Sequence, residues 1–242
     1  MSEILERHRR IWNEKKILRE AYGEWYKKIA KDLLNDNGKT IEIGGGSGNF
    51  KEIKPDIISS DIDKCRWLDL CFDAHYMPFA DGTVSNIVLV DVLHHLSNPV
   101  HFFNEAARVL KNGGRVVMVE PFPSPFSLFI YKIFHPEPFV MDADYFDKRG
   151  VDKKDPWESN QAIPYLLFFK HKKKFMKTFW QNFNILKRNR ISCILYPLSG
   201  GFENRALIPD YLIEVFKLFE MLLTPFRWFM AFRCYVVIEK KG

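Results

Sequence analysis

The 242-residue sequence has little cysteine, and its spacing excludes the common metal and redox motifs. The chain carries four cysteines, and no two of them form a C-x-x-C pair or lie beside a histidine pair. We therefore expect reduced thiols, as in a cytoplasmic protein, and no bound metal. The four are Cys65, Cys71, Cys193 and Cys234.

Long apolar runs are also missing. No stretch of about 18 uncharged apolar residues occurs, which argues against a membrane-spanning helix. The first ten residues are charged throughout and lack the apolar centre of a secretory signal. These absences predict a soluble, cytoplasmic protein and leave open a peripheral contact with a membrane.

Charge and composition set wider limits. The 36 basic and 30 acidic residues give a net charge of +6, which permits an anionic partner without requiring one. A hydrophobic content of 47% is ample for a packed core. The length fits a single domain, 1–242, with a substantial insertion.

Glycine, by contrast, is concentrated directly behind one apolar strand. Residues 39–50 read K-T-I-E-I-G-G-G-S-G-N-F. Such a strand with a Gly-rich turn directly after it brings the backbone of an α/β domain close to a nucleotide-like ligand. The stretch is equally compatible with a plain strand-to-helix turn, so its meaning depends on the residues beyond Phe50.

Strands and helices alternate around this turn. Amphipathic spacing predicts one or two helices over 3–35, and a helix also begins after Asn98-Pro99. Unbroken apolar runs bounded by turn residues predict buried strands. Alternation of this kind indicates a parallel sheet with right-handed crossovers. The expected strands cover 41–43, 57–61, 86–91 and 115–121.

The character of the chain changes after Pro121. Of the 22 phenylalanines, 17 lie in 121–242, together with a cluster of prolines. We expect a loop or small cap at 122–180 that includes a helix over 161–180, and not a second domain. Strands are expected at 183–194 and 231–240, with a helix from Asp210 to Leu223 between them.

Five short motifs in residues 40–121 together resemble the class I S-adenosylmethionine-dependent methyltransferases. Within that family they are most similar to the small-molecule enzymes of the ubiquinone- and menaquinone-biosynthesis type. The order and distances of the motifs are more specific than any one of them. The motifs are E-I-G-G-G-S-G at 42–48, Asp61, D-A-x-x-x-P-F at 73–79, D-V-L-H-H-L at 91–96 and R-V-L-K-N-G-G at 108–114.

The resemblance implies a fold and a domain plan. The fold is α/β, a Rossmann-like, doubly wound and mostly parallel sheet of seven strands, with helices on both faces and an insertion after the fifth strand. The expected parts are an N-terminal helical segment at 1–37, a cofactor-binding core at 38–121, a substrate-side insertion at 122–180 and C-terminal strands and helix at 181–242.

The resemblance also implies S-adenosylmethionine as cofactor, with S-adenosylhomocysteine as product. Asp61 would accept hydrogen bonds from the ribose hydroxyls, the Gly-rich turn would lie under the methionine and ribose, and Asp73 would bind the adenine amino group. The full set of expected cofactor-binding residues is Glu42, Gly44, Gly45, Gly46, Gly48, Asp61, Ile62, Asp73, Ala74, Asp91 and Val92.

Three residues near the expected strand ends are candidates for a catalytic base. His94 and His95 come after the fourth strand, and imidazole titrates near neutrality. Glu120 ends the fifth strand. The histidines equally fit a cap of the next segment, and methyl transfer proceeds without a dedicated base where donor and acceptor are held in line.

Other functions compete with this interpretation. A dinucleotide-binding oxidoreductase needs glycine or alanine at 49, where the sequence has Asn49. The N-P-P-Y type of motif found in base-modifying methyltransferases is absent after the fourth strand, and no RNA-binding signature is present, so we expect no nucleic-acid partner. A non-catalytic relative that binds S-adenosylmethionine remains an alternative.

The link between Asp61 and Asp73 departs from the family pattern. Eleven residues are too few for both a full helix and a further strand. We expect a turn around Cys65-Arg66-Trp67, with the adenine side open or covered by Trp67.

The back half of the chain bears on the methyl acceptor. The basic run at 170–177 fits either a phosphate or membrane contact or a solvated helix face, and the helix at 210–223 is apolar over most of its surface. We expect a small-molecule acceptor that is apolar or lipid-linked. Six aromatic residues either line its pocket or pack as core: Phe122, Phe126, Phe129, Tyr131, Phe134 and Phe139.

Overall fold

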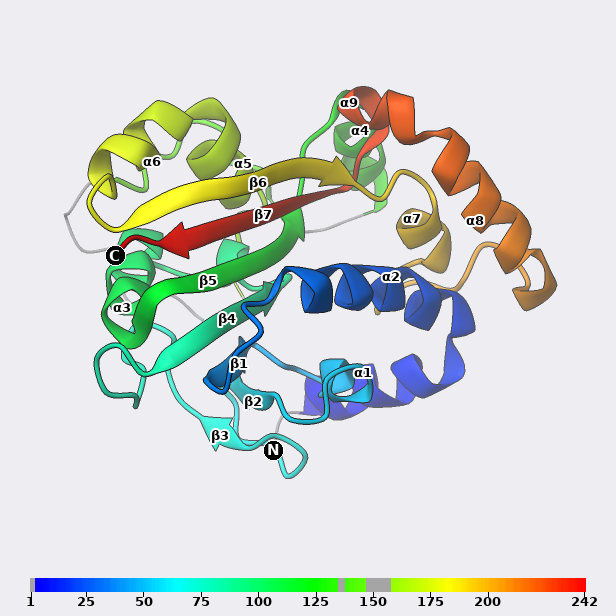
Figure 1. Cartoon of the computed structure of the whole chain (residues 1–242). Helices are drawn as coiled ribbons and strands as arrows, with labels where there is room; N and C mark the ends of the chain where they lie inside the picture. The colour runs from blue at the N-terminus through cyan, green and yellow to red at the C-terminus, as the bar shows by residue number, and fades with distance from the viewer. Residues whose placement is uncertain (1–2, 135–137, 147–157) are drawn as a thin grey trace.

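A computed structural model describes residues 3–134, 138–146 and 158–242. Seven strands form one sheet in the order β3-β2-β1-β4-β5-β7-β6, with helices on both faces (Figure 1). β1 pairs in parallel with β2 and β4, and β4 pairs in parallel with β5. β7 is antiparallel to both β5 and β6. The predicted mostly parallel α/β sheet is therefore confirmed.

The front of the chain shows the predicted alternation. Helices cover 3–32, each parallel strand ends near the predicted residue, and a single 3-10 turn comes after the glycines. The elements are α1 (Glu3–Glu14), α2 (Lys16–Asp32), β1 (Lys39–Ile43), η1 (Asn49–Glu52), β2 (Ile58–Asp61), β3 (Leu70–Cys71), β4 (Val84–Val90), η2 (Leu93–His95), α3 (Pro99–Val109) and β5 (Leu110–Pro121).

The back of the chain adds two strands and several short helices. Helical structure within 161–180, a helix after Asp210 and two final strands were predicted; α4, α7 and α9 were not. The elements are α4 (Pro125–Phe134), α5 (Ile163–Tyr165), the π-helical turn η3 (Leu166–Lys170), α6 (Lys172–Thr178), β6 (Phe183–Ile191), α7 (Leu195–Ser199), η4 (Asp210–Leu212), α8 (Ile213–Leu222), η5 (Thr224–Phe226), α9 (Arg227–Met230) and β7 (Arg233–Lys240).

Two apolar layers hold the helices against the sheet. Ile87 and Met118 belong to one core cluster with residues of α3, η3 and α6, whereas Val88 and Val117 belong to another with residues of α2. Side chains alternate between the faces of a strand, so adjacent residues of β4 and β5 supply both layers. Continuous apolar strands were the signal that predicted this interior sheet.

The link between Asp61 and Asp73 contains the expected turn and one strand that was not predicted. No helix forms there, as predicted, but the link does contain a strand, since Leu70 and Cys71 pair in parallel with β2. A strand of two residues needs little chain, which is why the short spacing accommodates it. The sheet therefore reaches seven strands despite the missing helix.

Candidate active site

One cavity of about 690 Å³ lies where β1, β2 and β4 end. Open α/β sheets place their ligands at this carboxyl edge of the parallel strands. The volume falls within the roughly 300–1,000 Å³ typical of small-molecule sites. Of the predicted residues, the cavity is lined by Glu42, Gly44, Gly45, Gly46, Asp61, Ile62, Asp73, Ala74, Asp91, Val92, His94 and His95.

The Gly-rich turn is packed too closely for side chains. A Cβ on Gly44, whose φ is +66°, would lie 2.3 Å from Val92 Cγ2. A Cβ on Gly45 would lie 2.3 Å from Ser59 Oγ. The turn therefore brings bare backbone to the cavity wall, as its sequence predicted.

Gly48 is the one predicted glycine outside this cavity. It lines a smaller cavity with Trp67. It is also the residue directly before the turn η1, and its φ is +77°. The indole Nε1 of Trp67 donates a hydrogen bond to Gly46 O at 2.9 Å. Gly48 and Trp67 thus support the turn from behind.

Asp61 ends β2 beside the turn. Its Oδ2 accepts a hydrogen bond from Gly46 N at 3.0 Å, and its Oδ1 accepts one from Asp63 N at 3.1 Å. Burial raises the pKa of the Asp61 carboxyl, while these N–H donors oppose the shift. The carboxylate is thereby fixed at the cavity wall with further acceptor capacity.

Glu42 lies deeper than Asp61. Its side chain is buried and accepts a hydrogen bond from Ser59 Oγ. Burial raises the pKa of Glu42 to about 7, against the opposing effect of the serine hydroxyl. Glu42 can therefore exchange a proton near neutral pH.

Asp73, Ala74 and Ile62 form another part of the cavity wall. Asp73 Oδ1 accepts a hydrogen bond from His75 N at 2.9 Å and lies 2.7 Å from His75 Nδ1. Ala74 is buried, and Ile62 is half-exposed. His75 also lines the cavity, and its role was not predicted.

Asp91 takes part in a buried polar cluster. It has a φ of +57°, and its Oδ2 accepts a hydrogen bond from Tyr22 OH at 2.8 Å. Its Oδ1 lies 3.0 Å from Arg233 Nε in an ion pair. The Arg233 guanidinium lies over the ring of Tyr196 at 4.0 Å and donates to Tyr131 OH at 2.6 Å.

Arg233, Tyr22 and Tyr196 line the cavity, and sequence reasoning missed Arg233 and Tyr196. A signal for Arg233 exists, because an arginine within the apolar run of the last strand has to find a buried partner. Which acid serves as that partner depends on the antiparallel position of β7, which spacing does not reveal. The aromatic side chains of α2 serve both purposes: Trp25 packs in the core, and Tyr22 and Tyr26 line the cavity.

Glu120 does not line the cavity but lies directly behind it. Its Oε1 accepts hydrogen bonds from Val92 N at 2.9 Å and Leu93 N at 2.7 Å, and its Oε2 lies 2.8 Å from His94 Nδ1. Burial raises the pKa of Glu120 to about 7, opposed by the two backbone donors. Glu120 therefore orients the residues after β4 and cannot itself reach a ligand.

The two histidines have different surroundings. His94 is buried between Glu120 and the cavity. His95 is more exposed, and its Nδ1 lies 3.3 Å from the carbonyl oxygen of Glu158. The rings lie 4.2 Å apart, so both face the same region of the cavity.

The N-terminal helix α1 closes one side of the cavity. Ile4, Leu5 and His8 lie in the wall together with Phe202 of the loop after α7. Arg7 Nη2 binds both carboxylate oxygens of Glu203, at 2.5 and 2.6 Å. This ion pair links α1 to the loop after α7 beside the cavity.

Of the six aromatic residues for which the sequence left open a pocket or a core position, none whose side chain the structure describes lines the cavity. Phe122 and Tyr131 are buried in the core, whereas Phe129 is 61% exposed. The side chain of Phe134 lies outside the described residues. The cavity is instead lined by Tyr22, Tyr26, Phe72, Tyr196 and Phe202. The core alternative therefore holds for Phe122 and Tyr131, and α4 packs beside α9 and the start of β7 and not over the strand ends.

No metal-binding group of histidine, cysteine and acidic side chains occurs in the part of the chain that the structure describes. Within the same residues, no helix is long and apolar enough to cross a membrane.

Comparisons with known proteins agree with this geometry. Residues 42–118 match the family described as methyltransferase domain. An uncharacterised protein of Methanocaldococcus jannaschii is 28% identical over 98 residues, which cover 37% of this chain and 41% of that protein. The match spans less than half the length of each curated relative.

Solved structures show the same fold at low identity. A SAM-dependent methyltransferase from Archaeoglobus fulgidus superimposes with a TM-score of 0.54 at 16% identity, covering 92% of this chain and 94% of that one. Geranyl diphosphate C-methyltransferase from Streptomyces coelicolor A3(2), solved with Mg²⁺, geranyl diphosphate and S-adenosyl-L-homocysteine, gives 0.50 at 12% identity over 93% and 81%. Residues 42–118 thus match a methyltransferase domain, and the chain shares the fold of S-adenosylmethionine-dependent methyltransferases.

Proposed function

We propose that this protein transfers a methyl group from S-adenosylmethionine to a small-molecule acceptor. The observation that supports the proposal most directly is that the Gly44–Gly46 turn, Asp61, Asp73 and Asp91 all line one cavity. These residues are far apart in the sequence and have no common structural task. A shared ligand explains why they meet at the carboxyl edge of the sheet.

The residues present fit this cofactor. S-adenosylmethionine, when bound, supplies a methyl group already activated by a positively charged sulfonium. Asp61 would accept from the ribose hydroxyls, and the bare Gly44–Gly46 backbone would lie against the methionine and ribose. Glu42 and Asp91 place carboxyl oxygens on the same wall, where they would accept hydrogen bonds from the ammonium group. Asp73 and Ala74 would hold the adenine.

His94 is the stronger candidate for a general base. Its Nδ1 lies 2.8 Å from Glu120 Oε2, so a proton on Nδ1 leaves Nε2 as the basic nitrogen. In this role His94 would take a proton from an oxygen or nitrogen of the acceptor, and Glu120 would position the ring. Holding the two reactants in line provides the remaining acceleration.

The acceptor has to fit beneath α1 and the 202–204 loop. We propose an apolar or lipid-linked acceptor, because Leu96, Tyr196 and Phe202 supply apolar surface to a cavity whose other walls are assigned to the cofactor. The acceptor atom would lie within reach of His94. A non-catalytic relative that binds the cofactor alone is the remaining alternative.

Calorimetric titration tests the proposal. We expect S-adenosylmethionine and S-adenosylhomocysteine to bind, and NAD not to bind. Asp61→Ala should weaken cofactor binding by on the order of a hundredfold, since two charge-assisted hydrogen bonds of roughly 1.5 kcal/mol each are lost. Asp63→Ala is the matched control, because the Asp63 side chain does not line the cavity. Binding of NAD alone, or equal affinity in both variants, would refute the assignment.

A further inference from the structure

Positive charge is concentrated in one part of the chain. Residues 159–202 contain no aspartate or glutamate and eight lysines or arginines. This segment therefore carries +8, more than the +6 of the whole protein. Such asymmetry is typical of a surface that meets an anionic partner. The eight are Lys170, Lys172, Lys173, Lys174, Lys177, Lys187, Arg188 and Arg190.

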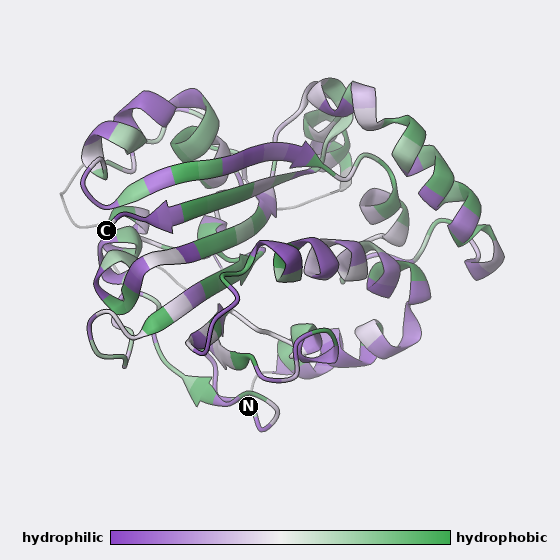
Figure 2. Cartoon of the chain, viewed as in Figure 1, coloured by the Kyte–Doolittle hydropathy of each residue, from purple (hydrophilic) through white to green (hydrophobic). Residues whose placement is uncertain are grey.

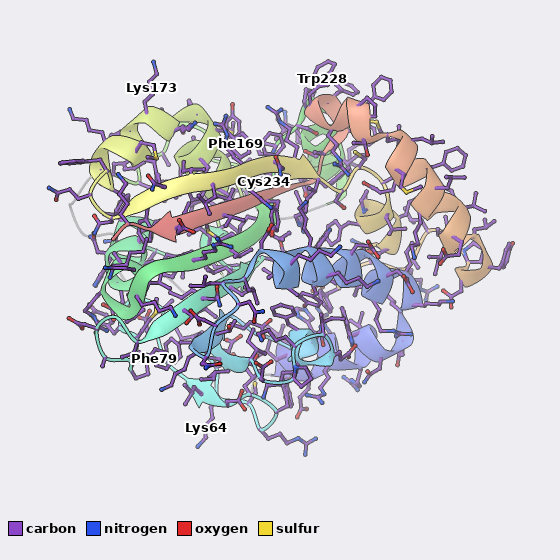
Figure 3. All side chains as sticks on the ribbon, viewed as in Figure 1. Lys64, Phe79, Phe169, Lys173, Trp228 and Cys234 are labelled. Carbon is purple, nitrogen blue, oxygen red and sulfur yellow. The ribbon has the colours of Figure 1, made fainter. Side chains whose placement is uncertain are left out.

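The fold places most of these charges on α6 and on the edge strand β6. Residues 186–190 of β6 are exposed, and in Figure 3 Lys173 projects outward from α6. Lys174 pairs with Asp144 and Lys187 with Asp32. Among the described residues, no carboxylate forms an ion pair with Lys172, Lys173 or Lys177. We call α6 and β6 the basic strip.

An exposed apolar surface adjoins the basic strip. α9 packs against both α4 and β6, and α8 leads into it through η5. Figure 2 shows α8 mostly hydrophobic and α6 mostly hydrophilic. Several apolar side chains of this region are more than 40% exposed, and we call six of them the apolar face: Phe129, Ile133, Leu222, Phe226, Trp228 and Phe229.

The two surfaces point the same way. In Figure 3, Lys173 and Trp228 project from the same side of the molecule, the side of β6, whereas Lys64 projects from the opposite side. The sheet order explains this arrangement, because β6 is one edge and β3 the other. A single flat partner can therefore contact the basic strip and the apolar face at once.

We propose that this side of the protein docks onto an anionic phospholipid bilayer. The basic strip would lie against the negatively charged headgroups, and the apolar face would enter the interfacial layer. Tryptophan and phenylalanine beside lysine and arginine are the composition that such an interface favours.

The contacts of α8 support a surface that faces lipid. Glu220 is turned inward and accepts hydrogen bonds from Cys193 N at 2.7 Å and Ile194 N at 2.8 Å. Lys217 binds Glu20 on α2 at 3.0 Å. Because these charges are used within the protein, the outward side of α8 presents mainly apolar groups.

The aromatic rings beside the charges of β6 are poorly placed to stack on the bases of single-stranded nucleic acid. Nucleic-acid surfaces offer open aromatic rings on which bases stack. Here Phe122 is buried, and the ring of Phe169 is covered by the guanidinium groups of Arg188 at 5.0 Å and Arg190 at 5.7 Å. The charge is therefore better matched to lipid headgroups than to stacked bases.

The docking surface also reaches the candidate active site. α4 carries Tyr131, whose hydroxyl accepts a hydrogen bond from Arg233 Nη1 at 2.6 Å, and Arg233 lines the cavity. A lipid-linked acceptor would thus enter from the side that faces the bilayer. That last step rests on the proposed function, whereas the docking itself does not.

Vesicle co-sedimentation of the full chain tests the docking without measuring methyl transfer. The protein is mixed with phosphatidylcholine vesicles and with vesicles that also contain phosphatidylglycerol, at low and high salt. We expect binding to the anionic vesicles, reduced by salt. Lys173→Glu should weaken it at least about fivefold, and Trp228→Ser about tenfold.

Matched controls lie on other parts of the surface. Lys64→Glu changes the same charge at the opposite edge, and Tyr76→Ser removes an aromatic side chain that is 70% exposed. Both should bind vesicles as the unaltered protein does. No binding to anionic vesicles, or equal losses in the controls, would overturn the proposal. So would a dimer in size-exclusion chromatography that Trp228→Ser dissociates, or tighter binding to a single-stranded oligonucleotide than to vesicles.

Calorimetry with S-adenosylmethionine and sedimentation with vesicles are separate measurements. The proposed function and the proposed docking can therefore be refuted independently. A protein that binds the cofactor but not vesicles would retain the proposed function and lose the docking surface.

Discussion

The front and back parts of the chain, 39–121 and 122–242, build one sheet but place their apolar side chains differently. Of the twenty large hydrophobic residues that are exposed in the described chain, fifteen lie beyond Pro121. In the front part β4 is almost wholly buried, whereas α8 and α9 leave most of their apolar surface open. Apolar side chains of the front part thus mostly form the core, whereas many of those in the back part face solvent.

The two parts also contribute different groups to the cavity. The front part brings backbone and carboxylates to a cavity through short contacts, such as Gly46 N to Asp61 Oδ2. The back part supplies side chains from distant elements, such as Arg233 at the start of β7. In the function we propose, cofactor binding would therefore depend on the front, and the acceptor and its delivery would depend on the back.

The aromatic core between the two parts gives the largest expected effect. Phe103 of α3 is fully buried and contacts Phe168, Phe175 and Phe179 of the back part with ring centroids 5.2–5.9 Å apart. Phe103→Ala should lower the free energy of unfolding by about 3–5 kcal/mol, measured by urea denaturation.

Phe129→Ala is the matched control, because the same side chain is exposed there. It should change the free energy of unfolding by less than about 0.5 kcal/mol. Two separate unfolding transitions in the Phe103→Ala variant would contradict the view of one shared core, since the two parts would then be independent folding units.

His94→Gln tests whether His94 is the general base. With an acceptor that the protein methylates, turnover should fall about a hundredfold, or about 3 kcal/mol in activation free energy, because the base is lost. Calorimetric affinity for S-adenosylmethionine should remain unchanged. His95→Gln is the comparison variant, and a larger loss in that variant would transfer the role to His95.

Glu42→Gln isolates a buried charge of the front part. The pKa of Glu42 is raised from 4.5 to about 7 by burial, so between these values the folded protein keeps a proton that the unfolded chain has released. Unfolding free energy should therefore fall as pH rises through this window, by up to about 3 kcal/mol from this group.

Glutamine does not titrate, so the unfolding free energy of the Glu42→Gln variant should depend less on pH between 4.5 and 7. Urea titrations at several pH values measure the difference between the two proteins. Glu14→Gln, at an exposed position, should retain the slope of the unaltered protein. Identical slopes in all three would mean that Glu42 stays ionised throughout.

That the predicted glycines and acids meet at one cavity was largely predictable from sequence. Gly44, Asp61 and Asp91 lie at or directly after strand ends, and parallel strands bring their carboxyl ends to one edge, so strand order alone collects them. Their contacts were not predictable. Glu120 was expected to be a base at the acceptor side, but its position behind Val92 and His94 depends on how β5 lies relative to β4.

The back part was less predictable because its elements are short and pack through antiparallel pairing. The strands β6 and β7 were expected, and so was the helix of 210–223. Apolar periodicity cannot distinguish a buried face from an exposed one, so Phe129 and Phe126 were assigned equally to a pocket or the core. The structure exposes Phe129, whereas Phe126 on the same helix packs against Phe229 and Phe232.

The two outer strands of the sheet have a consequence for self-association. An open edge strand is a template on which another chain can add a strand and begin an aggregate. β3 offers only two residues for such pairing, and β6 carries Lys187, Arg188 and Arg190 along its exposed length. One edge is thus too short to propagate the sheet and the other repels its own copies, so the charges of β6 also keep the protein from forming intermolecular β-sheet.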